Sequence, residues 1–300
     1  MKLTKKQGGI DLHDWAQGLI RREYEQVYGT VPKDWLKTIR YDFMKLYDKV
    51  YVVPNDVNIK PQVVFDNVKD FAKSNGQYIV LFRDNTAIVN GRDPIDVDGA
   101  VSVTTSVSCE RFGVIACKHG LYYCDMQRDV LHWVGYNLLI QCAKYYRNTL
   151  VLIAGNSVYV EGQKYNIAAT LDIDNVYVTR IDEFGTLYTT IGFIYNNIHV
   201  VIGDEPTKVL FGFMNGSFLP ACVLYKGDIF VDYGYETNEA RITYYPHGKL
   251  KDIEYSLGNI YGYDEEDGLQ LLELCNETDF EKIMDQYKNM LEKNVRQLDV

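Results

Sequence analysis

Along much of the chain, short apolar runs alternate with turn-forming residues at a nearly constant spacing. The clearest case is residues 68–91, where two apolar runs flank the pair Asp84-Asn85. Runs of about four to eight residues rich in Val, Ile, Leu, Tyr and Phe predict β-strands. Asn, Asp and Gly accept the positive φ that short hairpin turns require. This segment therefore predicts a β-hairpin.

The same pattern of run, turn and run recurs along the sequence. The first turn residues are Asp48, Asp84, His119, Gly155, Asn196, Lys226 and Gly258, with separations of 36, 35, 36, 41, 30 and 32 residues. A hairpin alone cannot bury an apolar face, so repeated hairpins must stack on one another. Radial stacking of such units gives a propeller and linear stacking gives a solenoid. We expect a mainly β chain with a β-propeller over residues 50–266.

The repeat resembles a known family at one segment in particular, VSCERFGVIACKHGLYYC at residues 107–124. This segment is similar to the repeat of regulator-of-chromosome-condensation-type propellers, whose units run strand, Gly-rich loop, apolar strand, Asp/Gly turn and strand. At the level of pattern the resemblance covers residues 65–265. The copies differ from that family in length and in its glycines, so the resemblance implies the architecture and transfers no functional residue. We expect six blades, with five and seven as the alternatives.

The N-terminal part of the chain, residues 1–49, predicts helices. Apolar residues recur at every third and fourth position over residues 11–28, with Asp11 as the N-cap and Gly29 as the stop. A second helix is expected from Pro32 to about residue 46. In the competing interpretation, residues 45–53 at the end of this segment form a first, weak hairpin instead.

At the C-terminal end, residues 267–300, the sequence predicts another helix. Thr278 and Glu281 form a capping box, and an apolar stripe follows it. The stripe contains Phe280, Ile283, Met284, Tyr287, Met290 and Leu291. We expect this helix to pack on the propeller, and the alternative is that it docks a partner.

The net charge of −10 and the pI near 5.0 disfavour nucleic-acid binding, because an acidic chain repels phosphates. No apolar segment follows the basic start, so no secretory signal is expected, and no window is apolar enough to span a membrane. We therefore expect a cytoplasmic protein, or a virion protein if a phage encodes it. The six cysteines form no close pair and are expected to be reduced and buried. For Cys117 and Cys124 the alternative is a strained cross-strand disulfide.

The sequence contains no motif that indicates catalysis or a cofactor. The five histidines are scattered, and there is no P-loop, nucleophile elbow or dinucleotide fingerprint. We expect no metal, no cofactor and no enzymatic activity.

One surface is predicted by the repeat itself. In a propeller blade, the loops between the first and second strands and between the third and fourth strands emerge on the same face. The segments that follow the repeated hairpins are expected to be such loops and to form an interaction face. Its residues are Arg92, Asp93, Asp125, Gln127, Arg128, Glu161, Lys164, Asp204, Glu205, Tyr235 and Glu236. This largely acidic set favours a basic or amide-rich protein partner, and ordinary solvated loops are the alternative.

These observations favour a non-enzymatic protein-interaction or assembly module that binds a protein partner or a second copy of itself. The Tyr- and Asn-rich composition without a signal suits a bacteriophage structural or host-directed protein. A glycan-binding propeller is one alternative, although only Trp133 lies well inside the repeats. A hydrolase with carboxylates at the propeller channel is another, although no repeated inward carboxylate is evident.

Overall fold

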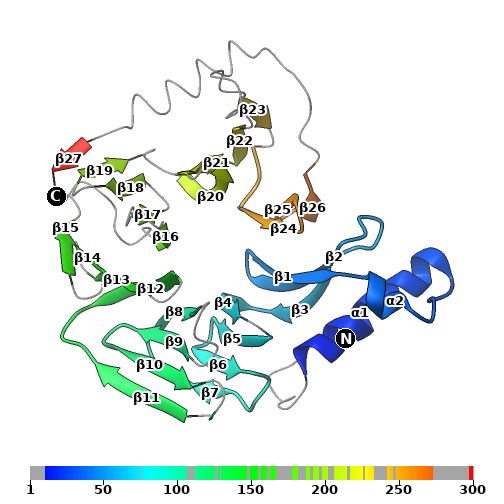
Figure 1. Ribbon diagram of the computed structural model, residues 1–300, viewed down its shortest axis with the longest axis horizontal. Helices are drawn as coiled ribbons and strands as arrows, with labels where there is room; N and C mark the ends of the chain where they lie inside the picture. Colours follow the sequence, from blue (N-terminus) through cyan, green and yellow to red (C-terminus); the bar gives the residue numbers. More distant parts are fainter. Residues whose placement is uncertain are drawn as a thin grey trace. The chain divides into compact units, whose positions relative to one another are not determined.

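The structure is a computed structural model that describes most of the first half of the chain and separate stretches of the second half. The described residues are 11–74, 76–106, 112–125, 128, 130–146, 149–154, 157–160, 163–166, 178–181, 187–189, 192–195, 198–201, 206–214, 217–225, 227–232, 242–245, 248–272 and 297–299. They divide into two compact units, Met1–Ala154 with Tyr255–Asn259 and Gly155–Glu254 with Ile260–Val300. The strands form seven sheets in the described part of the chain (Figure 1).

The first four sheets are built from consecutive antiparallel strands. The first contains β1 (Tyr41–Leu46), β2 (Lys49–Pro54) and β3 (Gln62–Asp66). The second contains β4 (Val68–Ser74), β5 (Gln77–Phe82), β6 (Thr86–Val89) and β7 (Ile95–Asp96). The third contains β8 (Ala100–Thr105), β9 (Phe112–Cys117), β10 (Gly120–Asp125) and β11 (Val130–Gly135). The fourth contains β12 (Ile140–Tyr146), β13 (Thr149–Ala154), β14 (Ser157–Val160) and β15 (Gln163–Asn166).

The remaining three sheets follow the same plan, except that the fifth also contains β27, which is not consecutive with its other strands. The fifth contains β16 (Val178–Ile181), β17 (Leu187–Thr189), β18 (Gly192–Tyr195), β19 (Ile198–Val201) and β27 (Gln297–Asp299). The sixth contains β20 (Pro206–Met214), β21 (Ser217–Tyr225), β22 (Asp228–Asp232) and β23 (Ile242–Tyr245). The seventh contains β24 (Asp252–Ser256), β25 (Asn259–Asp264) and β26 (Gly268–Leu271).

Every predicted hairpin position falls between two consecutive strands. Asp84-Asn85 separates β5 from β6, and Asn85 has the expected positive φ of 63°. The turn between β9 and β10 is shifted by one residue from the prediction, to Lys118-His119, because Gly120 already belongs to β10. Gly155-Asn156, Asn196-Asn197 and Lys226 lie outside the described residues, but each falls between the end of one strand and the start of the next. The predicted repeat of hairpins is confirmed.

Polar side chains link the first strands of successive sheets. Asp70 on β4 accepts a hydrogen bond from the backbone N–H of Val103 on β8 at 2.8 Å. Ser102 Oγ on β8 accepts from the backbone N–H of Ala143 on β12 at 2.9 Å. These polar side chains therefore find hydrogen-bond partners in the neighbouring sheet and not only in their own.

The outer strands of the same sheets do not approach each other in this way. In the described part of the chain β4 packs against β8 and β8 against β12, whereas β7 and β11 make no comparable contact. Neighbouring sheets thus converge at their first strands and splay at their last strands. Wedge-shaped packing of successive four-stranded sheets is the arrangement of propeller blades, and it differs from the parallel stacking of a solenoid. The chain is a mainly β, propeller-type repeat protein, while the expected number of six blades is not confirmed.

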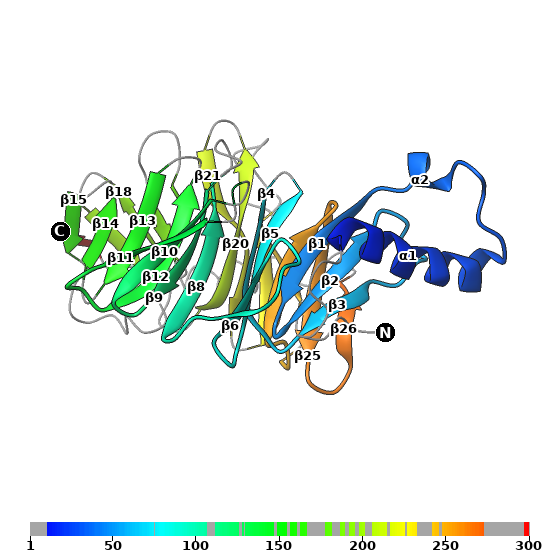
Figure 2. The ribbon, with the colours of Figure 1, turned by 90° about the horizontal axis from the view of Figure 1, so that it is seen from below.

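The first predicted helix is confirmed as α1 (Leu12–Tyr28), capped by the Asp11 side chain and ended by Gly29 at φ 83°. Leu12, Ala16, Leu19 and Ile20 enter a core made with β1 to β6, so this helix packs on its own sheets. Figure 2 shows α1 running beside β1, β2 and β3.

The second helical prediction is wrong except for about one turn. α2 spans only Trp35–Thr38, and β1 occupies Tyr41–Leu46. Residues of β1 pair with β2 in the register Phe43↔Val52, so strand pairing prevails over the local helical periodicity. The competing hairpin interpretation was the better one. The capping box and the apolar stripe of the predicted C-terminal helix lie outside the described residues. The described parts of the 267–300 segment are strands, β26 (Gly268–Leu271) and β27 (Gln297–Asp299).

Cys117, Cys124 and Cys142 are buried thiols that form no disulfide, as expected. Cys117 pairs with Gly120 and Cys124 with Gly113, so the two cysteines are not cross-strand neighbours and the disulfide alternative is wrong. Burial raises the pKa of the Cys117 thiol to about 11 and that of Cys124 to about 12.

These raised pKa values predict unreactive thiols in the folded protein. With a pKa of about 11, Cys117 carries roughly 100-fold less thiolate, the reacting species, than an ordinary cysteine, and Cys124 with its higher pKa carries still less. In native protein at about pH 8, iodoacetamide should leave Cys117 and Cys124 unmodified, and it should label both in denaturant. Mass spectrometry of the peptides measures this, and rapid native labelling of either residue would contradict the described packing.

Candidate functional site

The splayed edge between the second and third sheets forms an open rim. β7 is only two residues long, Ile95–Asp96, and pairs with β6. β11 is six residues long and pairs with β10 over its whole length. Leu131 and Trp133 point to the same face of β11, and because the short β7 gives little cover there they stay 41% and 44% exposed. Val130, at the start of β11, is 53% exposed.

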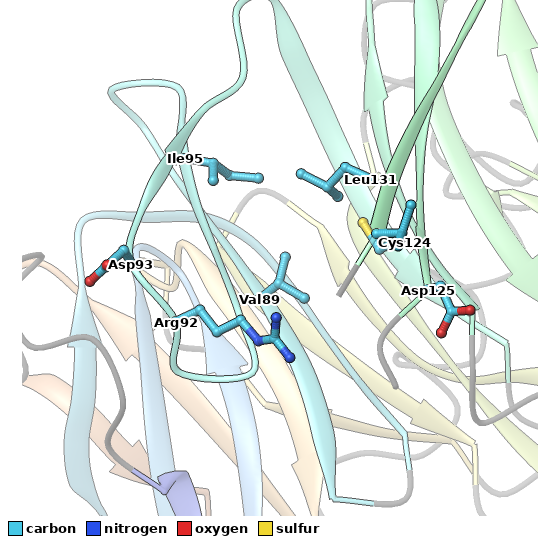
Figure 3. A pocket seen from close by; sticks show the side chains of 8 residues that line it. Val89, Arg92, Asp93, Ile95, Cys124, Asp125 and Leu131 are labelled. Atoms are coloured by element: carbon cyan, nitrogen blue, oxygen red, sulfur yellow. The ribbon is translucent and has the colours of Figure 1, made fainter. Parts of the chain in front are cut away.

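A small pocket of about 50 Å³ lies at this rim. It is lined by Val89, Arg92, Asp93, Ile95, Cys124, Asp125, Val130 and Leu131. Figure 3 shows Ile95 and Leu131 directed toward each other across the pocket. The Arg92 guanidinium points from its loop toward the side where Asp125 lies, while Asp93 points away. The pocket therefore has apolar walls and a mouth with both signs of charge.

Trp133 is held in a fixed position beside this pocket. Its ring centroid lies 4.6 Å from that of Tyr122, and the two rings are tilted by 51°. A Cβ on Gly120 would lie only 2.5 Å from a carbon of the Trp133 ring, so glycine is required for the ring to lie against the strand. The tryptophan thus presents a rigid, half-exposed aromatic surface.

β11 is also an edge strand, because the order of its sheet is β11-β10-β9-β8. Its sequence, Val-Leu-His-Trp-Val-Gly, contains no Lys, Asp, Glu or Pro. Natural edge strands usually carry charges, proline or bulges that prevent pairing with another strand. None of these protective features occurs in β11, so its own sequence does not prevent pairing with another strand.

The structure brings together part of the predicted interaction face. Arg92, Asp93 and Asp125 line the pocket. The backbone N–H of Arg128 donates to Asp125 Oδ1 at 2.9 Å, which places Arg128 at the same loop. Lys164 is exposed on β15, which belongs to the other unit. The remaining predicted residues lie outside the described part of the chain: Gln127, Glu161, Asp204, Glu205, Tyr235 and Glu236.

One further loop that follows a repeated hairpin has a structural role. Asp264, at the end of β25, is 1% exposed. Its Oδ1 accepts hydrogen bonds from the backbone N–H groups of Glu266 at 2.8 Å and Asp267 at 2.6 Å. This carboxylate organises the turn into β26 and is not available to a partner.

Sequence reasoning missed the apolar surface of β11. Four consecutive exposed residues, Val130 to Trp133, lie where an outer strand of a blade should alternate polar and apolar positions. This lack of alternation was the available signal. Within the described residues there is no cluster of three or more His, Cys, Asp or Glu side chains suited to a metal ion. Of the helices that the structure describes, none has the length and apolar character needed to cross a bilayer.

Comparison with known proteins gives likeness of fold only. No family model matches the chain, and no curated protein matches it. The structure of PorZ, a bacterial surface component of the type-IX secretion system of Porphyromonas gingivalis, is 11% identical with a TM-score of 0.50, over 80% of this chain and 36% of that one. The chain thus spans about a third of PorZ, and the likeness concerns the fold alone.

Two further solved structures have lower scores. The Neurospora crassa Pan2 WD40 domain is 11% identical over 84% of this chain and 94% of its own, with a TM-score of 0.48. The Cps50 (Swd1) beta-propeller domain of Myceliophteria thermophila is 11% identical over 68% and 84%, with a TM-score of 0.39. The narrower resemblance to regulator-of-chromosome-condensation-type propellers is not confirmed.

Proposed function

We propose that this chain is a non-enzymatic protein-interaction module that binds an extended peptide segment of a partner along β11. The observation that carries the proposal is the uncharged, apolar edge strand beside a pocket with apolar walls. Strand addition uses both features: main-chain hydrogen bonds along the free edge give affinity, and a pocket for a side chain gives specificity. β11 supplies the edge, and the hollow between Ile95 and Leu131 supplies the pocket.

A short peptide suits this surface better than a folded partner. The exposed apolar surface comprises only three side chains of one six-residue strand. A stable interface between folded proteins buries about 1,200–2,000 Å². The peptide we propose is extended, places an aliphatic side chain between Ile95 and Leu131, and carries polar groups that meet Arg92 and Asp125.

Leu131→Lys should reduce peptide binding by roughly tenfold or more, because it places an ammonium group at the pocket and on the pairing edge. The probe is a displayed library of random 12-residue peptides selected on the wild-type chain, with the best sequence then measured by fluorescence anisotropy. Leu139→Lys is the matched control. Leu139 is 54% exposed but lies outside β11 and the pocket, so its substitution should leave the affinity unchanged.

The two variants separate the possible outcomes. If the library yields no binder to the folded wild-type chain, the proposed function is wrong. If a binder is found but both lysine variants bind it equally, the module binds peptides elsewhere and the assignment to β11 is wrong. Circular dichroism confirms that each variant is folded.

The proposed cellular location and biological role of the chain rest on the sequence. We propose a propeller that works in the cytoplasm or in a virion, as a bacteriophage structural or host-directed protein. The seven sheets in the described part of the chain favour the seven-bladed alternative over the expected six blades. The proposed partner is a protein that supplies the extended peptide bound along β11. The alternative is that the chain associates with a second copy of itself. Light scattering of the purified chain tests that alternative, since a monomer without peptide is expected.

A further inference from the structure

A second, larger pocket lies away from the rim, at the first turn of α1. Its volume is about 390 Å³, within the range typical of small-molecule sites. It is lined by Leu12, His13, Tyr41, Asp42, Phe43, Lys73, Ser74, Gly76, Gln77 and Tyr78. These residues come from α1, β1 and the hairpin of β4 and β5. None of them belongs to the predicted interaction face.

One wall of this pocket is aromatic and fixed in position. The Tyr41 hydroxyl lies 3.0 Å from His13 Nδ1 and accepts a hydrogen bond from Gln17 Nε2 at 3.4 Å. The Phe43 ring packs edge-on against both neighbours, with centroids 5.6 Å from His13 and 5.9 Å from Tyr41. Helix and strand thus hold three rings together at the pocket.

The pocket is also lined by polar side chains that include hydrogen-bond donors and acceptors. Lys73 forms an ion pair with Asp42, and its ammonium lies 5.9 Å from the centroid of the Phe43 ring. Burial lowers the pKa of Lys73 to about 8. Ser74 and Gln77 add a hydroxyl and an amide. These side chains offer hydrogen bonds of both kinds to a ligand.

The charges around the pocket disfavour an anionic ligand. The single ammonium of Lys73 is already paired with Asp42. Burial raises the pKa of Tyr41, and the negative charges of Asp11 and Asp14 raise it further. The carboxylates of Asp11 and Asp14 at the start of α1 thus act on Tyr41 with negative charge, which opposes phosphates and carboxylates. A cationic ligand would be repelled by the ammonium group of Lys73, which lines the pocket. A neutral, hydrogen-bonding ligand fits best.

From this geometry we infer that the pocket binds a neutral saccharide of one or two sugar units. Sugar hydroxyls both donate and accept, so they match Asp42 and Gln77 as well as Lys73 and Tyr41. The apolar C–H face of a sugar ring packs on the partly exposed ring of Tyr41, which the buried Phe43 supports from behind. This site is independent of the peptide site at β11, and either can exist without the other.

The test uses the full-length chain and an array of immobilised neutral, sialylated and sulfated glycans. The neutral mono- or disaccharide with the strongest signal is then titrated by calorimetry. Lys73→Met and Tyr41→Phe should each weaken binding roughly three- to tenfold, the effect of losing one hydrogen bond. Tyr28→Phe is the matched control. The Tyr28 hydroxyl donates to Asp56 outside the pocket, so the variant should bind the saccharide with the affinity of the wild-type chain.

Each contrary result overturns the inference in a distinct way. If the array shows no neutral glycan bound, the pocket is not a saccharide site. Preferential binding of sialylated or sulfated glycans contradicts the charge argument. If Lys73→Met, Tyr41→Phe and a third variant, Gln77→Ala, all bind like the wild-type chain, the sugar site lies elsewhere. Unchanged thermal melting of the variants shows that any loss comes from the site and not from unfolding.

Discussion

Replacing Gly227 with alanine is expected to destabilise the fold by roughly 2–5 kcal/mol, the sum of backbone strain and steric overlap. Gly227 lies in the turn before β22 with φ +84°, a conformation that L-residues with a side chain rarely adopt. An added Cβ would lie 2.5 Å from the carbonyl carbon of Gly248 and 2.7 Å from its oxygen. The obstacle is backbone, so it cannot rotate away.

The cause of this close approach is the path of the chain between two sheets. The backbone N–H of Leu250 donates to the Gly227 carbonyl at 3.3 Å as the chain passes toward β24. The same kind of bond joins Val68 to Asp48 at 2.7 Å and Ile140 to Lys118 at 2.7 Å. In each of these three places, the chain segment that leads to a later strand crosses over a hairpin turn and is hydrogen-bonded to it. At Gly227 the crossing segment lies so close to the turn that no side chain fits between them.

Gly258→Ala is the matched control for this prediction. Gly258 has the same φ of +84°, but nothing lies within 4 Å of an added Cβ. It should cost only the backbone strain, roughly 1–2 kcal/mol. Urea unfolding followed by circular dichroism measures both variants. Equal losses in the two would show that the chain does not cross the Gly227 turn as described.

Lys208→Met should destabilise the chain by roughly 3 kcal/mol, because it removes a largely buried cation from between two carboxylates. Lys208 Nζ on β20 lies 3.0 Å from Asp252 and 2.8 Å from Glu254, both on β24. Methionine keeps the length of the side chain and removes its charge. The substitution removes the attraction between Lys208 and the two carboxylates and leaves these carboxylates to repel each other. Both effects lower the free energy of unfolding.

The pH dependence of this effect follows from the pKa of Lys208. Burial acts to lower that pKa, but the charges of Asp252 and Glu254 outweigh burial and raise it above the ordinary value. A raised folded-state pKa contributes stability below the unfolded-state pKa, and this is lost as the pH rises through the folded-state value. The cost of Lys208→Met should therefore be the same at about pH 7 and about pH 9.

Lys249→Met is the control, because Lys249 pairs with Glu266 in an exposed position. Exposed ion pairs contribute little, so the urea midpoint should stay at the wild-type value. A Lys208 variant as stable as the Lys249 variant would mean that the ion pair does not join β20 to β24.

The sequence predicted the features that depend on local chemistry. The periodic apolar stripe with Asp11 as cap was enough to define α1. Asn and Gly pairs located the hairpins because positive φ is a local requirement, as Asn85 illustrates. The prediction failed at β1, whose spacing of Phe43 and Leu46 imitates a helix. Only pairing with β2, a non-local interaction, makes this segment a strand.

The candidate site was predictable only in part, for a similar reason. The repeat located the loops of Arg92 and Asp125, since their position follows from counting strands after each hairpin. It could not locate the exposed surface of Leu131 and Trp133, because that exposure depends on how short β7 is in the neighbouring sheet. The pocket at α1 likewise joins His13 to Lys73, which lie far apart in the sequence.

The central claim is that β11 pairs with an extended peptide, and amide hydrogen exchange tests it most directly. Exchange is measured by mass spectrometry on the wild-type chain with and without the library-selected peptide. The account predicts slower exchange confined to residues 130–135 and the adjoining loop of Arg92, with no change in the Leu131→Lys variant. Protection elsewhere with none in β11 would contradict it.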